Sequence, residues 1–119
     1  MPDKILVKGL KVFGHHGANP SEREQGQHFV VDLELALDLG EAGRTDRLEA
    51  TVSYSPLIKQ VGRIVSGEPC FLLEALAERI ASAVLEYPQV SRTLVRVTKP
   101  APPIAAHLEG VAVEIERSR

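Results

Sequence analysis

A regular alternation of apolar and polar residues marks the clearest strand of this chain. Between His28 and Leu39 every second residue is apolar, and the intervening positions include the carboxylates Asp32, Glu34 and Asp38. Because successive side chains of a strand point to opposite faces, this pattern predicts a sheet with one face on the core and a more polar face opposite. The aliphatic and β-branched run from Lys4 to Phe13 predicts a second strand.

The apolar spacing changes to a helical period in the middle of the chain. Ser55 followed by Pro56 is typical of an N-cap and a first helical residue, and apolar residues then recur at helical spacing until Gly67. A second amphipathic segment begins near Leu72 and ends before Pro88. The sequence therefore predicts two consecutive amphipathic helices.

Two further strands are predicted after the helices, at 93–99 and 110–117. The resulting order favours an α+β fold, with a four-stranded antiparallel sheet and both helices on one face, in a single domain spanning residues 1–119. Such a sheet leaves long unpaired edges that invite pairing with another copy. Closure of several copies into a barrel would remove those edges.

The composition narrows the possible partners. The chain has 119 residues, 44% hydrophobic and 25% charged, as in folded globular proteins. A formal net charge of -2 without any Lys/Arg cluster argues against nucleic acid, and no apolar run approaches the roughly 18 residues of a membrane helix. Cys70 is the single cysteine and cannot form an internal disulfide, and Met1 to Leu10 lacks the layout of a signal peptide. We therefore expect a cytoplasmic protein.

Lys99 is a candidate for acid–base chemistry. It lies two residues after Val97 and four after Val95, so a strand would place it on the apolar face, and Pro100 ends that strand. A lysine that is partly removed from water exchanges protons nearer neutral pH, as a general acid or base must. The alternative is an edge lysine whose ammonium extends into water.

Glu74 falls in the first turn of the second predicted helix, directly after Leu72 and Leu73. Its carboxylate would lie beside backbone N–H groups without helical partners, and could bind a planar ring that offers two adjacent N–H groups. The alternative is that Glu74 only complements the helix dipole.

Tyr54 and Glu22 are further polar candidates. Tyr54 directly precedes the predicted Ser55 cap, where its phenol could hydrogen-bond or relay a proton, although many such tyrosines are core residues. Glu22 lies on the first of two connections, 14–27 and 100–109, that exceed the roughly 2 to 5 residues of most hairpin loops and are expected to be functional. Taken alone, Glu22 is also compatible with a solvated surface charge.

Metal and phosphate sites are not predicted. The histidines give no compact ligand pair such as H-x-H, and adjacent side chains would point in different directions on an extended chain. Gly14 and Gly17 do not form a phosphate-binding G-x-G-x-x-G loop, and Cys70 is expected to be a buried, inert thiol. The histidines are His15, His16, His28 and His107.

The most specific signal is a set of five short motifs in fixed order. They are Gly14-His15-His16-Gly17 with Glu22 and Gly26-Gln27; Glu41-Ala42 with Thr45-Asp46; Thr51-Val52-Ser53-Tyr54; Leu72-Leu73-Glu74 with Ala77-Glu78; and Lys99-Pro100 with Pro102-Pro103-Ile104. Together they closely resemble the dihydroneopterin aldolase family, which has the tunnelling fold, and they cover nearly the whole chain. Each motif alone is weak, but five on the right elements favour the functional interpretation of the residues above.

The resemblance implies a role for five residues. Glu74 corresponds to the carboxylate that anchors the 2-amino group and adjacent ring N–H of a pterin, and Leu73 to the backbone contact beside it. Tyr54 corresponds to a tyrosine delivered from a neighbouring subunit, Glu22 to a loop carboxylate near the substrate, and Lys99 to the proton donor and acceptor.

The family's reaction belongs to folate biosynthesis: 7,8-dihydroneopterin is cleaved to 6-hydroxymethyl-7,8-dihydropterin and glycolaldehyde. The ring imine accepts the electrons, so the resemblance implies neither a metal nor another cofactor. It also implies a homo-oligomer, because members assemble as tetrameric rings that are commonly stacked in pairs. Epimerisation of 7,8-dihydroneopterin is expected as a side activity, since the same proton relay can rebuild the broken bond from the other face.

Three alternatives stay open. A dihydroneopterin triphosphate epimerase of the same fold would need cationic side chains for the triphosphate, and Arg23, Arg44 and Arg47 are scattered along the sequence. A zinc-dependent lyase or synthase of the same fold would use the histidines. A non-catalytic oligomer could bind pterins or purines through Glu74.

Overall fold

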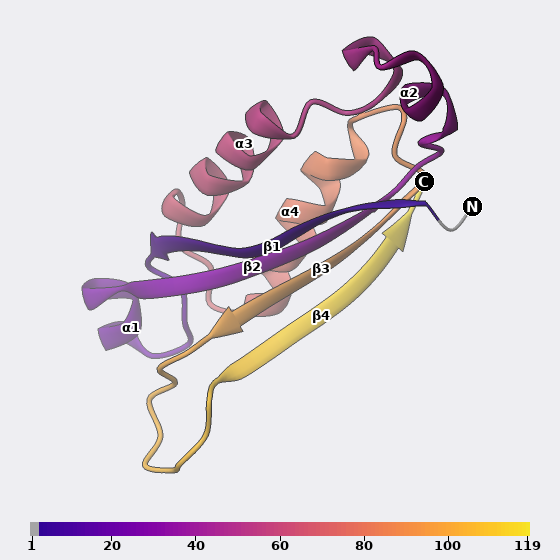
Figure 1. Ribbon diagram of the computed structural model, residues 1–119. Coiled ribbons are helices and arrows are strands. Elements are labelled where there is room, and N and C mark those ends of the chain that lie inside the picture. Colours follow the sequence, from indigo (N-terminus) through magenta and orange to yellow (C-terminus); the bar gives the residue numbers. More distant parts are fainter. Residues whose placement is uncertain (1–2) are drawn as a thin grey trace.

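Four antiparallel strands form the central sheet. The computed structural model describes residues 3–119, and the strands lie in the order β1-β2-β3-β4, each antiparallel to the next (Figure 1). The strands are β1 (Lys4–Gly14), β2 (Gln27–Ala36), β3 (Arg92–Lys99) and β4 (Val111–Ser118). The predicted antiparallel α+β arrangement is confirmed, and β1 and β4 are the two edges of the sheet.

Strand β2 buries its apolar residues against the helices and leaves its polar residues on the opposite face. It ends at Ala36, so the predicted end at Leu39 is wrong. Lys4 at the start of β1 and Arg92 at the start of β3 both pair with Ala36, and neither neighbour extends far enough to continue the ladder. Leu37 remains buried, which explains why the apolar alternation continues past the strand.

Two long helices cover one face of the sheet, as predicted (Figure 1). Helix α3 (Tyr54–Ser66) packs on β1, and helix α4 (Leu73–Leu85) packs on β3 and β4. The predicted cap at Ser55 is wrong: the cap is Ser53, and Pro56 is the third helical residue instead of the first. Proline is tolerated there because the N–H groups of a first helical turn have no helical partner.

Three short helical segments were not predicted. They are α1 (Pro20–Gln25), α2 (Gly40–Thr45) and a 3-10 turn (Leu48–Ala50). Each has six residues or fewer, which is too short for an apolar period to be recognised in the sequence. Helices α1 and α2 lie at opposite ends of the sheet (Figure 1). Among the helices of residues 3–119, none is long and apolar enough to cross a membrane.

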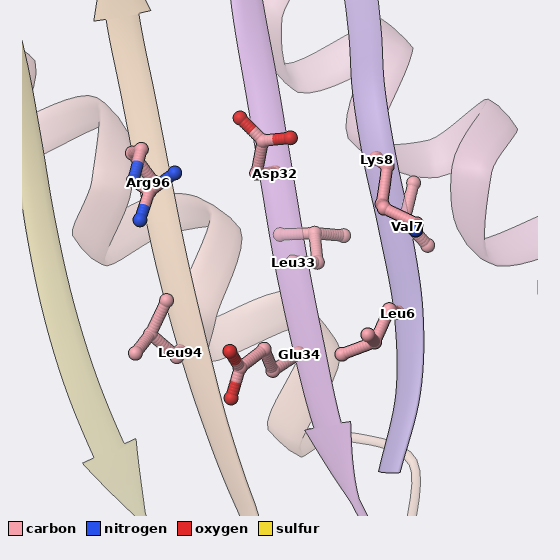
Figure 2. Close-up of a pocket in the computed structure, with 8 residues that line it drawn as sticks. All are labelled: Leu6, Val7, Lys8, Asp32, Leu33, Glu34, Leu94 and Arg96. Atoms are coloured by element: carbon pink, nitrogen blue, oxygen red, sulfur yellow. The ribbon is translucent and has the colours of Figure 1, made fainter.

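Charged side chains line the face of the sheet that carries no helix. Figure 2 shows a pocket of ≈ 170 Å³ on this face, where Asp32 of β2 lies between Lys8 of β1 and Arg96 of β3. Asp32 also accepts a hydrogen bond from the backbone N–H of Gly9 at 2.8 Å, within a bulge of β1. Neighbouring strands are linked by the ion pairs Lys4–Glu34 (3.1 Å), Arg92–Glu116 (2.6 Å) and Arg96–Glu114 (2.8 Å).

Candidate active site

One end of the sheet gathers most of the candidate residues. Strands β1 and β3 end there and β2 and β4 begin there, because neighbouring strands are antiparallel. Helix α1 lies at the same end (Figure 1). A backbone hydrogen bond from the N–H of Gly17 to the carbonyl of Cys70 (2.9 Å) ties the segment before α4 to it. The candidates on α1, β3 and the first turn of α4 therefore share this end.

Lys99 is the last residue of β3 and lies on the helix-covered face, after the buried Val95 and Val97. Its side chain is only 12% exposed, and its ammonium donates to Oε2 of Glu22 at 2.7 Å. The Glu22 side chain is 7% exposed. The ammonium is thus paired inside the protein, and the alternative of an edge lysine that extends into water is wrong.

Helix α1 fixes the carboxylate of Glu22. Its Oε1 accepts a hydrogen bond from the backbone N–H of Asn19 at 3.2 Å, while Oε2 accepts from Lys99. Burial alone would raise the pKa of Glu22, but the hydrogen bonds from Lys99 and Asn19 and the neighbouring positive charges outweigh burial and lower that pKa. A Cβ on Gly17 would overlap this carboxylate, so glycine makes room for it. Glu22 is not the solvated surface charge that its sequence context alone allows.

The first turn of α4 combines a carboxylate with free backbone donors. The N–H of Leu76 donates to the carbonyl of Leu72 at 3.3 Å, and the N–H groups before it lack helical partners. The side chain of Leu73 is buried, so its backbone is the part that can reach a ligand, whereas the side chain of Glu74 is exposed. This geometry fits a planar ligand that both donates and accepts hydrogen bonds along one edge.

Tyr54 lies away from the other candidates. It is the first residue of α3 and is 61% exposed, so it is not a core tyrosine. The last turn of α3 reaches the Lys99 end through Val65, which places Tyr54 roughly 16 Å away along the helix axis, at 1.5 Å per residue. Tyr54 lines an open groove of ≈ 360 Å³ along the free edge of β1. Ile5 and Ile58 line the same groove. The structure does not bring Tyr54 and Lys99 together within one copy.

Gln27 holds the chain that follows Lys99. Its side-chain amide accepts from the backbone N–H of Ala101 and donates to the carbonyl of the same residue, both at 3.1 Å. A pocket of ≈ 240 Å³ opens here, lined by Glu22, Gln27, Ala101 and Pro103 among others. The sequence motif contained Gln27 but gave no hint of this contact, because its partner is 74 residues away.

His16 is a buried link between segments, a role that the sequence interpretation did not predict. It is 1% exposed; its Nε2–H donates to the carbonyl of Val65 at 2.6 Å, and its Nδ1 accepts from the backbone N–H of Cys70 at 3.0 Å. These roles require the neutral Nε2–H tautomer. Burial lowers the pKa of His16 and favours this neutral form.

The histidines do not form a metal centre within one copy. His15 donates through Nδ1 to the carbonyl of Arg23 at 2.9 Å, and His16 uses both ring nitrogens. In the part of the chain that the structure describes, no three His, Cys, Asp or Glu side chains come together in a group that could hold a metal ion. The zinc-dependent alternative therefore lacks a ligand set among residues 3–119.

The pocket on the helix-free face is not the same site. It lies in the middle of the sheet, and its lining includes Asp32 and Arg96 but neither Lys99 nor Glu22 (Figure 2). Lys99 lies on the opposite face of β3 from Arg96, because side chains alternate along a strand. We therefore place the candidate active site at the end of the sheet, on the helix-covered side.

Comparisons with known proteins find one family over nearly the whole chain. The family model "FolB: Dihydroneopterin aldolase" matches residues 5–116. The dihydroneopterin aldolase of Bacillus subtilis is 47% identical over 118 residues, and that of Streptomyces coelicolor is 45% identical over 117 residues, each match covering 98% of both chains. The crystal structure of Escherichia coli dihydroneopterin aldolase in complex with neopterin superposes with a TM-score of 0.89 and 28% identity, covering 98% of this chain and 99% of that one.

Proposed function

This chain belongs to the dihydroneopterin aldolase family, with its tunnelling fold, and we propose that Lys99, Glu22, Leu73 and Glu74 form its active site together with Tyr54 of a second copy. The activity is that of a carbon–carbon lyase of folate biosynthesis. The substrate is 7,8-dihydroneopterin, and the products are 6-hydroxymethyl-7,8-dihydropterin and glycolaldehyde.

The observation that carries the assignment of the site is the partly buried pair of Lys99 and Glu22. A lysine paired at 2.7 Å with a carboxylate, and mostly removed from water, is a fixed proton donor and acceptor. An ion pair that served stability alone would more commonly lie at the surface, because burying two charges carries a desolvation cost. Its place beside the open first turn of α4 points to substrate chemistry.

The first turn of α4 orients the ring of the substrate. The carboxylate of Glu74 accepts hydrogen bonds from the 2-amino group and the adjacent ring N–H of the pterin, and the backbone beside Leu73 contributes a further polar contact. Two acceptors on one carboxylate match two neighbouring donors on one ring edge, which selects pterins over rings without that pair. This anchoring leaves the side chain of the substrate directed toward Lys99.

The cleavage needs one proton to leave the substrate and one to return. Lys99, through a water molecule, takes the proton of the side-chain 2′-hydroxyl, so that this carbon becomes the aldehyde of glycolaldehyde. The electron pair of the breaking carbon–carbon bond moves into the ring imine. Protonation of the remaining side-chain carbon then completes 6-hydroxymethyl-7,8-dihydropterin, with Tyr54 of the second copy helping to deliver the proton. Because the imine accepts the electrons, no cofactor is needed.

A homo-oligomer explains why Tyr54 is exposed. Strands β1 and β4 are both free edges and run antiparallel, so β4 of one copy can pair with β1 of the next in the same sense as the strands within the sheet. A staggered pairing of this kind brings the groove beside Tyr54 to the Lys99 end of the neighbour. Repeated pairing closes the sheet into a barrel without free edges.

The triphosphate epimerase alternative is less well supported by the charges. Arg23 donates to the carbonyls of Gly17 and Ala18 and lies over the ring of Phe71, so it is already engaged. Of the other arginines of that alternative, Arg47 is already paired with Glu49 at 3.2 Å, and Arg44 lies on α2, at the end of the sheet where α3 begins with Tyr54 (Figure 1). Epimerisation of 7,8-dihydroneopterin itself is expected as a side activity, because the proton relay is reversible.

A chelator-treated assay tests the proposal. The protein is incubated with 7,8-dihydroneopterin, and both products are followed by chromatography for wild type, Lys99→Ala and the exposed Lys59→Ala as a matched control. We expect both products from wild type and the control, and a loss of about 100-fold or more in kcat for Lys99→Ala, with binding of the ring retained. Turnover of the triphosphate in preference to the free triol, or normal turnover by Lys99→Ala, would overturn it.

A further inference from the structure

We propose that His16 is a positioning residue that fixes the distance between the ring-binding and proton-transfer segments of the active site. The proposal rests on the proposed function, because it concerns Glu74 on one segment and Lys99 with Glu22 on the other. His16 touches none of these side chains through the hydrogen bonds of its ring, so it acts through the backbone that carries them.

Three segments meet at the ring of His16. The ring follows β1, its Nε2–H binds the last turn of α3 at Val65, and its Nδ1 binds the N–H of Cys70 before α4. The carbonyl of Cys70 in turn accepts a hydrogen bond from the N–H of Gly17. Cys70 is therefore held through both its N–H and its carbonyl. The ring also packs edge-on against Phe29 of β2, with centroids 5.2 Å apart.

Short connections lead from this junction to both halves of the site. On one side the chain runs from Gly17 to α1, where Asn19 holds the Glu22 carboxylate against Lys99. On the other side it runs from Cys70 directly into the first turn of α4 with Glu74. A shift of Cys70 relative to Gly17 would therefore move the ring-binding segment relative to the proton-transfer pair.

Only a group with an acceptor and a donor on opposite sides can make both contacts in this buried place. The neutral imidazole does so with its two nitrogens, and an apolar residue would leave the N–H of Cys70 without a partner. Asparagine places an acceptor at the position of Nδ1, and glutamine places a donor at the position of Nε2. These two amides can therefore separate the contact to Cys70 from the contact to Val65.

The test compares His16→Asn with His16→Gln, using His28→Asn and His28→Gln at the exposed His28 as matched controls. Binding of unsubstituted pterin, which lacks the cleavable side chain, measures Glu74 alone, and kcat for 7,8-dihydroneopterin measures the relation of Glu74 to Lys99. We expect His16→Gln to lower kcat by at least about 10-fold, since a misplacement of about 1 Å can cost about 100-fold. We expect His16→Asn to keep kcat within about 3-fold of wild type, and both variants to bind one pterin per chain with a Kd within about 3-fold.

Three results would overturn the proposal. They are an unchanged kcat in His16→Gln, a larger loss in His16→Asn than in His16→Gln, and a parallel loss of pterin stoichiometry and turnover, which a purely structural role predicts. Wild type without pterin binding or turnover would instead refute the proposed function. Should neither variant fold, ¹⁵N spectra of wild-type histidines still decide: the proposal requires a single Nε2–H tautomer at His16, and a mixture of tautomers contradicts it.

Discussion

The two places where the candidate residues lie are built very differently. At the Lys99 end of the sheet, three polar side chains are held by partners: Glu22 by Asn19 and Lys99, His16 by two backbone groups, and Gln27 by Ala101. At the β1 edge, Tyr54 is exposed beside an open groove. The contrast fits the proposal that one copy prepares the proton-transfer half of the site in advance, while Tyr54 acquires its surroundings through assembly.

Complementation between inactive variants gives the largest effect. We expect Lys99→Ala and Tyr54→Phe each to be nearly inactive, and a one-to-one mixture assembled together to regain about a quarter of wild-type activity, because one site in four then receives both intact residues from two copies. Turnover before and after joint refolding measures this. The matched control is a mixture of Lys99→Ala with Glu74→Ala, which alter the same half of the site and should restore nothing. Equal recovery in both mixtures would show that the halves are not divided between copies as proposed.

The sequence predicted the regular parts of this arrangement better than the contacts at the site. Alternation in β2 and helical spacing in α3 and α4 depend on local burial, which the pattern of apolar residues records directly. The pairing of Glu22 with Lys99 joins residues 77 apart through α1, a helix of six residues, and neither feature leaves a periodic signal. The motifs predicted a function for these residues, but the contacts of His16 and Gln27 required coordinates.

Removal of the Glu22 charge should destabilise the end of the sheet where Glu22 pairs with Lys99. In Glu22→Gln the ammonium of Lys99 loses its partly buried counter-charge, and we expect the free energy of unfolding to fall by about 2 kcal/mol, less than the roughly 3 to 5 kcal/mol of fully buried pairs that lose one partner. Denaturant unfolding measures it, with Glu41→Gln on the exposed surface of α2 as the control, for which no more than about 0.5 kcal/mol is expected. An equally small change for Glu22→Gln would mean that water reaches Lys99 easily.

Acidification should weaken the same end of the sheet through His16. Its pKa is lowered in the folded state, mainly by burial, with Arg79, His15 and Lys99 adding positive charge nearby and Cys70 as the adjoining thiol. The unfolded chain therefore binds a proton first, so the stabilisation is complete above pH 6.5 and declines as the pH falls below it, by at most about 1.4 kcal/mol per pH unit. The lowered pKa of Glu22 acts in a separate window, below pH 4.5. Denaturant unfolding of wild type and of His16→Asn at pH 7 and pH 5 measures this effect. The part of the loss in unfolding free energy that His16 causes should be absent from the variant.

The smallest change in stability is expected for Tyr54→Phe, in contrast to the substitutions at the Lys99 end of the sheet. Tyr54→Phe removes one hydroxyl from an exposed side chain, so the free energy of unfolding of a dissociated copy should change by no more than about 0.5 kcal/mol, although turnover by the assembled protein falls steeply. Denaturant unfolding at low protein concentration, beside activity at high concentration, separates the two quantities. A loss of stability comparable with that of Glu22→Gln would place the phenol in the structure of the single copy, and would remove the reason to assign it to a neighbour's active site.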